Sequence, residues 1–170
     1  MQVVQVVQAE GEADLDAVRR LFRAFVAWHR ERHTGDAHLI DAYFDDAAWE
    51  RELAGLPGDY APPGGSLLLA REAGVALGCV AAHPLDDETS EMKRLFVAPT
   101  ARHHGAGRAL AEELLTRARA GGYRRMVLDT SVRQTEAIVL YRSLGFVECE
   151  AYYDVPEQLL GWLVFFRLDL

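Results

Sequence analysis

One segment of the chain, LFVAPTARHHGAGRALAEELL, places Gly105 and Gly107 between an apolar run and an amphipathic run. Glycine disfavours a helix, so two glycines where a helix should begin indicate that something approaches the backbone closely. A helix start exposes unpaired N–H groups and the positive end of the helix dipole, and glycine lets a phosphate reach them. Arg102 and Arg108 could add charge-assisted hydrogen bonds. These residues predict a cradle for a pyrophosphate, with an ordinary turn as the alternative, because a Gly-x-Gly pair alone is a weak signal.

Charge is distributed unevenly along the 170 residues. Lys and Arg together number 18 and Asp and Glu 26, so the net charge is −8, which argues against general nucleic-acid binding. Residues 93–125 reverse this balance, since their only acidic residues are Glu112 and Glu113. The basic residues of this segment are Lys93, Arg94, Arg102, Arg108, Arg117, Arg119, Arg124 and Arg125. The segment is either a helix face crossed by ion pairs or the wall of a pocket for a polyanionic small molecule.

Hydrophobic periodicity divides the chain into short strands and helices. Alternation and short apolar runs predict strands at residues 2–8, 66–70, 75–82, 90–97, 125–130, 146–153 and 162–168. Apolar residues at helical spacing predict helices at residues 15–29, 37–53, 105–120 and 134–143. Asp14 is the expected N-cap of the first helix. Residues 55–65 are rich in proline and glycine, and we expect a loop there.

The order of these elements, β-α-α-β-β-β-α-β-α-β-β, predicts the fold class. We expect an α/β (α+β) fold, in which residues 1–170 form a single domain with a mixed central sheet of about seven strands and helices on both faces. Strands 90–97 and 125–130 flank a helix, which implies a parallel βαβ unit, whereas the hairpin before them is antiparallel. A nicotinamide-binding domain is excluded because it would need GxGxxG after its first strand, and the glycines here come late.

Two motifs in this order resemble the GNAT superfamily of acyl-CoA-dependent N-acyltransferases. The family motif Arg/Gln-x-x-Gly-x-Gly/Ala is matched by Arg102, Gly105 and Gly107, and a valine, here Val97, ends the strand before it. Downstream, the family pattern Asn-x-x-Ala-x-x-Leu-Tyr followed by Gly-Phe is matched by Ala137, Leu140, Tyr141, Gly145 and Phe146. Gln134 stands where the family usually has asparagine, which puts one polar contact near the cofactor in doubt. The clear resemblance covers residues 90–150.

The resemblance implies acetyl-CoA or a related thioester as the co-substrate, with no metal, and predicts how it binds. The pyrophosphate would lie on the N–H groups of residues 102–107. The pantetheine arm would pair with the main chain of Leu95 and Val97, in a gap where strand 90–97 splays away from strand 125–130. The expected cofactor-binding residues are Leu95, Phe96, Val97, Arg102, His103, His104, Gly105, Ala106, Gly107, Arg108, Gln134, Ala137 and Tyr141.

The implied reaction moves an acetyl group to a primary amine through a tetrahedral intermediate. An alkyl amine has a pKa near ~10 and must attack as the free base, so a general base is needed, directly or through water. Glu91, six residues before Val97, is the first candidate, with a surface carboxylate balancing Lys93 and Arg94 as the alternative. A backbone N–H of the same strand could stabilise the oxyanion. Tyr141 would protonate the departing thiolate, with a core tyrosine as the alternative.

The acceptor amine could be a small molecule, an amino acid or a peptide. The residues expected on the acceptor side are Tyr60, Arg94, Asp129 and Tyr152, with core packing as the alternative for Tyr152. Tyr60 lies in the loop that could close over the pocket, and Arg94 could face either the phosphates or an acidic substrate. The rival functions are a non-catalytic acyl-CoA-binding or sensing module, and acetylation of a protein N-terminus or lysine.

The remaining residues with reactive side chains predict no second chemistry. Cys79 and Cys149 lie in apolar runs and are expected to be buried free thiols in a reducing compartment. His29 and His33 are four residues apart, but no carboxylate or cysteine completes a zinc site, so we expect helix-surface histidines. We find no signal peptide or membrane-length apolar run, and expect a cytoplasmic protein without nucleic-acid or membrane partners. A homodimer is left open.

Overall fold

A computed structural model describes residues 3–170, so Gln2 of the expected first strand lies outside the described residues. The strands are β1 (Gln5–Gln8), β2 (Ser66–Glu72), β3 (Val75–Pro84), β4 (Thr89–Val97), β5 (Arg125–Ser131), β6 (Val147–Cys149) and β7 (Leu163–Asp169). The α-helices are α1 (Gly11–Arg32), α2 (Ala37–Tyr43), α3 (Asp46–Ala54), α4 (Ala106–Ala120) and α5 (Thr135–Ser143). Every expected strand and helix has a counterpart, but the bounds differ and the helix expected at residues 37–53 is divided in two.

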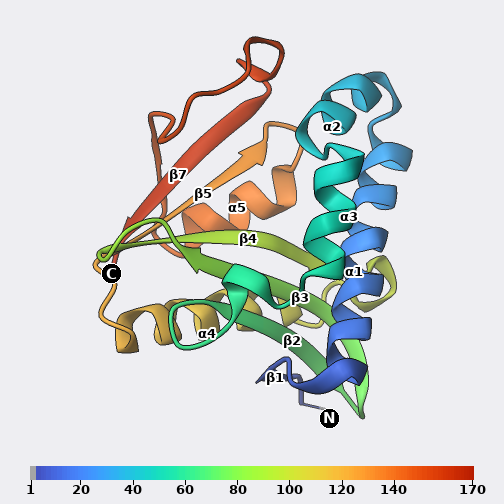
Figure 1. Cartoon of the computed structure of the whole chain (residues 1–170), viewed down its shortest axis with the longest axis vertical. Coiled ribbons are helices and arrows are strands. Elements are labelled where there is room, and N and C mark those ends of the chain that lie inside the picture. Colours follow the sequence, from blue (N-terminus) through green and yellow to red (C-terminus); the bar gives the residue numbers. More distant parts are fainter. Residues whose placement is uncertain (1–2) are drawn as a thin grey trace.

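The strands form one mixed sheet of seven strands in the order β1-β2-β3-β4-β5-β7-β6 (Figure 1). β4 and β5 are parallel and are connected through α4, while the other neighbours in the sheet are antiparallel. The predicted mixed sheet, its βαβ unit and its antiparallel hairpin are thus confirmed.

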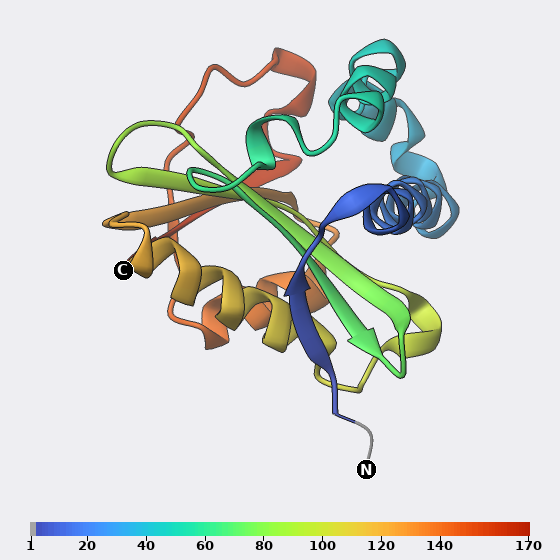
Figure 2. The ribbon, with the colours of Figure 1, turned by 60° about the horizontal axis from the view of Figure 1, so that its bottom comes forward.

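Helices cover both faces of this sheet (Figure 2). α1, α2 and α3 lie on one face, and α4 and α5 lie on the other. The side chains of β2 show why both faces need a helical cover, because they alternate between the two faces. Leu67 and Leu69 pack on the α1 side, and Leu68 and Ala70 pack on the α4 side. All four are fully buried, so a continuous apolar run supplies both cores.

The helix expected at residues 37–53 is two helices, α2 and α3. The chain breaks at Phe44, and the Asp45 side chain accepts a hydrogen bond from the Ala48 N–H at 2.9 Å, which caps the start of α3. The expected N-cap at Asp14 is also wrong. α1 begins at Gly11, and the Asp14 carboxylate instead accepts the N–H of Glu10 from inside the first turn.

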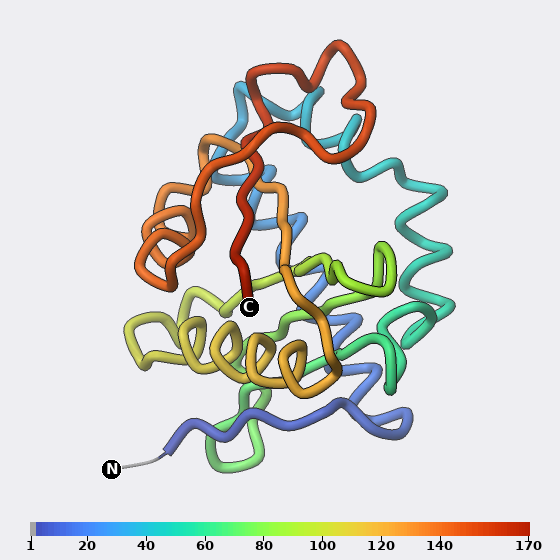
Figure 3. The backbone as a smooth tube through the Cα atoms, turned by 90° about the vertical axis from the view of Figure 1, so that its left-hand side faces the viewer, coloured from blue at the N-terminus to red at the C-terminus, as the bar shows by residue number. Residues whose placement is uncertain are grey.

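The strand expected at residues 146–153 is correct only at its beginning. β6 ends at Cys149, because the chain then leaves the sheet and the hydroxyls of Tyr152 and Tyr153 bond to β4 and β5. This β6–β7 connection passes α2 (Figure 3). Both cysteines are free: Cys79 is buried, whereas Cys149 is only half-buried. Across residues 3–170, no helix is both long enough and apolar enough to cross a membrane.

Candidate active site

β4 and β5 separate halfway along their length. Their last paired residues are Glu91 and Val127, although β4 continues to Val97 and β5 to Ser131. Figure 1 shows the two strands close at one end and far apart at the other. On the sides that face each other, the backbone N–H and C=O groups in the second halves of β4 and β5 therefore have no partner strand, although both strands stay paired on their other sides, with β3 and β7. The gap expected between these strands is present.

A β-bulge in β4 accounts for the separation. Phe96 lies opposite Cys79 of β3 and Lys93 lies opposite Ala81, so β4 has one residue more than β3 between these two pairs. Arg94, inside the bulge, has a φ of 62°, which side-chain-bearing residues rarely adopt. A bulge bends its strand and increases the twist, and this turns the second half of β4 away from β5. No glycine marks the position in the sequence.

The glycine segment joins this end of β4 to α4. Gly105 is the N-cap residue of α4 and has a φ of 78°, a left-handed conformation that favours glycine. A Cβ added at Gly105 would meet nothing within 4 Å, and one at Gly107 would contact only Val97 and Leu140, at 3.6 and 3.7 Å. The first turn of α4 therefore presents its N–H groups to an open approach, as an anion site requires.

A hollow of about 470 Å³ lies in front of this turn. Of the expected cofactor-binding residues, it is lined by Leu95, Phe96, Val97, Arg102, His103, Gly105, Ala106, Gly107, Gln134 and Ala137. His104 is exposed outside the hollow, and Arg108 also lies outside it, with its guanidinium bonded to Glu112 and Ser143. The structure thus brings together ten of the thirteen predicted residues in this hollow; besides His104 and Arg108, Tyr141 does not line it but lines a smaller neighbouring cavity.

Trp28 of α1 closes one side of this hollow, which the sequence did not indicate. The Arg102 guanidinium lies 4.3 Å from the centre of its ring and the Arg32 guanidinium lies 5.0 Å from it. Stacking on a ring orients guanidinium groups while leaving donors for an anion. Arg102 lines the hollow, whereas Arg32 does not line it and forms an ion pair with Glu136, which does.

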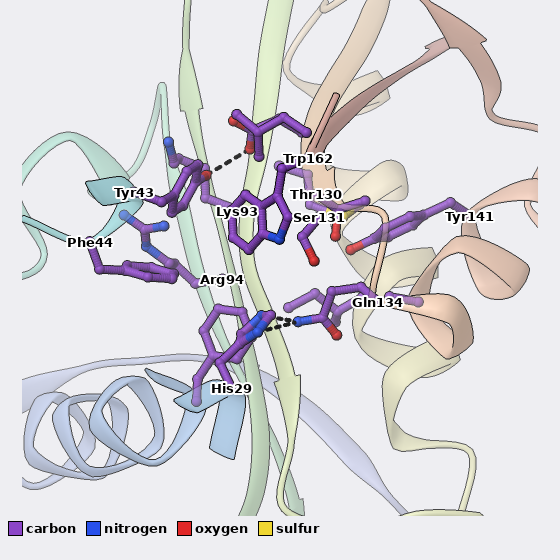
Figure 4. Close-up of a pocket in the computed structure, with 16 residues that line it drawn as sticks. His29, Tyr43, Phe44, Lys93, Arg94, Thr130, Ser131, Gln134, Tyr141 and Trp162 are labelled. Carbon is purple, nitrogen blue, oxygen red and sulfur yellow. Dashed lines mark hydrogen bonds between the residues drawn. The ribbon is translucent and has the colours of Figure 1, made fainter. Parts of the chain in front are cut away.

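A second, smaller cavity of about 60 Å³ continues from the hollow into the gap, and Phe25, Leu95, Gln134 and Ala137 line both. Tyr141 lines the smaller cavity and is 6% exposed. No hydrogen-bond partner of its hydroxyl is found within residues 3–170, and the side chain points toward Thr130 and Ser131 (Figure 4). Burial, and then the charge of Asp129, raise the pKa of Tyr141, so its hydroxyl keeps its proton.

His29 of α1 enters the same cavity opposite α5 and hydrogen-bonds to the Gln134 amide (Figure 4). It is 4% exposed, so the expectation of a surface histidine is wrong. Burial lowers the pKa of His29 to about 4, which keeps the ring neutral. The sequence did contain a signal, since His29 continues the apolar stripe of α1 through Phe25 and Phe22.

Glu91 is 4% exposed, so it is not the surface carboxylate that was the alternative reading. It accepts hydrogen bonds from His83 Nε2, at 2.7 Å, and from the Tyr152 hydroxyl, and Lys93 Nζ lies 3.6 Å away. Burial acts to raise the pKa of Glu91, but these three neighbours outweigh it and hold the pKa below its ordinary value. Glu91 does not line the small cavity; it lines a separate hollow of about 980 Å³ shared with Tyr152 and Tyr153.

Arg94 lines the small cavity, and the protein itself supplies the partner of its charge. Its guanidinium makes two hydrogen bonds of 3.1 Å to Glu52 of α3 and lies near the rings of Phe44 and Trp49. The Tyr60 hydroxyl also donates to Glu52, at 2.9 Å. Arg94 and Tyr60 therefore form an anchor between β4 and the helical layer.

Asp129 lines the small cavity from β5. Its carboxylate accepts hydrogen bonds from the hydroxyls of Tyr43, at 2.8 Å, and Tyr153 (Figure 4 shows the Tyr43 bond). Within residues 3–170, no group of three or more His, Cys, Asp or Glu side chains is arranged to hold a metal ion.

Comparisons with known proteins agree with this geometry. The acetyltransferase (GNAT) family matches residues 18–146. The chain is 42% identical over 121 residues to an uncharacterized N-acetyltransferase of Schizosaccharomyces pombe, which covers 70% of this chain and 72% of that protein. An acetyltransferase structure from Streptococcus agalactiae has a TM-score of 0.75 at 21% identity, over 100% of both chains. A GNAT family acetyltransferase from Elizabethkingia anophelis with acetyl-CoA bound has a TM-score of 0.53 at 25% identity, over 63% of this chain and 77% of that chain.

The chain therefore belongs to the acetyltransferase (GNAT) family. It is an acetyl-CoA-dependent N-acetyltransferase, and the expectation drawn from its two motifs is confirmed at this level.

Proposed function

We propose that the protein transfers the acetyl group of acetyl-CoA directly to a primary amine at the gap between β4 and β5. The observation that carries this proposal is the continuity of the two cavities. The larger one begins at the N–H groups of α4, where a diphosphate would bind, and the smaller one ends at the Tyr141 hydroxyl. A long ligand with an anionic head and a reactive tail fits such a path.

The residues around the larger hollow would hold the cofactor. N–H groups at the start of α4 and the Arg102 guanidinium would bind the pyrophosphate. The unpaired main chain of Leu95 and Val97 would bind the pantetheine amides as an added strand would. When bound, acetyl-CoA would supply the thioester carbonyl carbon that the amine attacks.

Tyr141 is the proposed acid. As the amine nitrogen bonds to the carbonyl carbon and the carbon–sulfur bond breaks, the leaving sulfur needs a proton, which the Tyr141 hydroxyl would donate. A backbone N–H in the bulged part of β4 would stabilise the oxyanion of the tetrahedral intermediate. The raised pKa of Tyr141 keeps its hydroxyl protonated, so a proton is present to donate, and the hydroxyl has no hydrogen-bond partner among residues 3–170 that would compete for it.

Glu91 is the proposed relay for the amine proton, which would reach it through water, since its carboxylate does not line the small cavity. Its lowered pKa makes it a weak base but keeps it ionised, and the adjacent His83 offers a route for the proton toward solvent.

Two measurements test the proposal together. Calorimetry with acetyl-CoA and with CoA should show binding and a higher unfolding temperature. A thiol-release assay with amines, amino acids and peptides should show turnover above the acceptor-free background. Binding without turnover on any acceptor would favour an acyl-CoA-sensing module instead, and no binding at millimolar CoA would contradict the cofactor path itself.

A further inference from the structure

Three carboxylates lie around the separation of β4 and β5, and two of them are matched by cations. Glu52 pairs with Arg94 through two contacts of 3.1 Å. Glu91 has Lys93 Nζ at 3.6 Å and His83 at 2.7 Å. The charges of Lys93 and Arg94 are therefore balanced by the protein itself.

Asp129 is the exception. No nitrogen of a Lys, Arg or His lies within 4.0 Å of its carboxylate anywhere in residues 3–170; its recorded partners are the hydroxyls of Tyr43 and Tyr153. Hydroxyl bonds satisfy the oxygens but leave the charge without a counter-ion. A half-buried carboxylate without a cation is costly, which is tolerated where a ligand supplies the opposite charge.

The surroundings of Asp129 suit an alkyl ammonium group. The Tyr43 ring lies 4.7 Å from Phe44 and 6.3 Å from Trp162, and the Tyr153 ring lies 5.4 Å from Phe165. Aromatic faces together with a carboxylate bind ammonium groups through cation–π attraction and charge. Figure 4 shows Tyr43 and Tyr141 approaching the cavity from opposite sides, so an amine at Asp129 would face the proposed acid.

We propose that Asp129, framed by Tyr43, Tyr153 and Trp162, binds the ammonium group of the acceptor before this group loses a proton through water to Glu91 and attacks as the free amine. The acceptor is then a primary amine whose amine-bearing carbon carries no carboxylate. An α-amino acid would place a second negative charge beside Asp129, while Lys93 and Arg94 are already paired. This inference rests on the proposed function. It narrows the acceptor from primary amines in general to primary amines that have no carboxylate on the carbon bearing the amine.

Matched pairs of acceptors test the substrate class on the wild-type protein, without any variant. Tyramine, phenethylamine and histamine are compared with tyrosine, phenylalanine and histidine in the thiol-release assay. Each amine should exceed its amino acid in kcat/KM by at least about tenfold, which corresponds to about 1.4 kcal/mol. Amino acids that equal or exceed their amines would overturn the inference and leave the proposed function standing. Acetyl-CoA binding with no turnover on either set would remove both.

A charge-removing variant tests the residue. Asp129→Asn keeps the shape and removes the charge, so kcat/KM for the amine should fall by about tenfold to a hundredfold, mainly through KM. Affinity for acetyl-CoA and the unfolding temperature should stay near wild type. Asp154→Asn, a change of equal charge at an exposed residue of the β6–β7 connection, should leave the affinities for both substrates unchanged. Equal losses of amine affinity in the two variants, or a parallel loss of acetyl-CoA affinity in Asp129→Asn, would assign Asp129 a structural role and overturn the proposal.

Discussion

Arg94, at the bulge of β4, and Glu52, on α3, form a two-pronged ion pair in which the Nε–Oε2 and Nη2–Oε1 distances are both 3.1 Å. The pair connects the distorted part of β4 to the helical layer on the acceptor side. Arg94 also lies 5.2 Å from the Phe44 ring and 4.9 Å from the Trp49 ring, so its planar group is held from several directions. The bulged part of β4, which is bent away from β5, is thus held in place by α3.

Glu52→Gln should destabilise the fold by about 2 to 3 kcal/mol, because it leaves the Arg94 charge uncompensated beside apolar rings. This loss of stability is small for a buried ion pair, because the pair is only partly buried: the Glu52 side chain is 25% exposed and the Arg94 side chain 11%. Glu50→Gln, on the same helix, removes an exposed pair with Arg23 and should cost about 0 to 1 kcal/mol. Urea unfolding of the two variants measures the difference. Equal losses would show that the Arg94–Glu52 pair is no anchor.

Tyr141→Phe should reduce kcat by about 10²-fold while CoA affinity is retained, because the change removes only the hydroxyl that would protonate the thiolate. Tyr123→Phe is the matched control, since its hydroxyl bonds to the Gly64 carbonyl away from both cavities. Steady-state rates and CoA titrations of both variants provide the readout. A Tyr141→Phe enzyme with wild-type turnover would exclude Tyr141 as the acid.

Gly107→Glu should change stability and binding in opposite directions. Glutamate favours a helix over glycine, and a negative charge in the first turn suits the helix dipole, so the free energy of unfolding should stay constant or rise. The same carboxylate would bring a negative charge to the phosphate approach and weaken CoA binding by about tenfold or more. Gly35→Glu, at a position with open space, controls for the substitution itself. Unchanged CoA affinity in Gly107→Glu would place the phosphates elsewhere.

Glu91→Gln should lower the rate by a similar factor across pH 6 to 9 and move no inflection of the pH profile in that range. The reason is that the pKa of Glu91 lies below its ordinary value of 4.5, so the wild-type carboxylate is ionised throughout. Glu150→Gln, which lies in the same hollow, should keep the wild-type rate. If an inflection between pH 6 and 9 disappears in Glu91→Gln alone, the assignment of a low pKa is wrong.

Stability should fall as the pH is lowered from about 6.5 toward 4. The pKa of His29 is lowered by burial from its ordinary 6.5 to about 4, so between these values the unfolded chain binds more protons than the folded chain. The contribution of His29 to the free energy of unfolding is fully present above about pH 6.5 and amounts to up to about 3 kcal/mol. His29→Gln should flatten this dependence, while His38→Gln, at an exposed position, should not. Equal slopes in both variants would assign the dependence to other groups.

The sequence was most informative where a local pattern has one structural solution. Gly105 and Gly107 predicted a backbone approach, and the order of strands and helices predicted a mixed sheet with helices on both faces. The expected lengths were less accurate. The strand after Phe146 ends early, because Tyr152 and Tyr153 bond to carboxylates on other strands, and the pattern of residues 150–153 alone contains no trace of those partners.

Trp28 and the bulge at Arg94 show what could not be predicted, whereas the burial of His29 was missed although this residue continues the apolar stripe of α1. His29 reads as polar by residue type, yet packing beside Gln134 buries it in the cavity. Trp28 and Arg102 are far apart in the sequence and meet only because α1 crosses the end of β4. Arg94 adopts a positive φ without a glycine, held there by its tertiary partners.

The order of the elements, the glycine turn and the family motifs were determined by the sequence alone, because each depends on interactions between residues close together along the chain. The tertiary structure decided which carboxylates are paired and which is not. That outcome depends on distances between α2, α3, β4, β5 and the β6–β7 connection, and such distances exist only once a bulged strand has separated from its neighbour and the helices have packed around the gap.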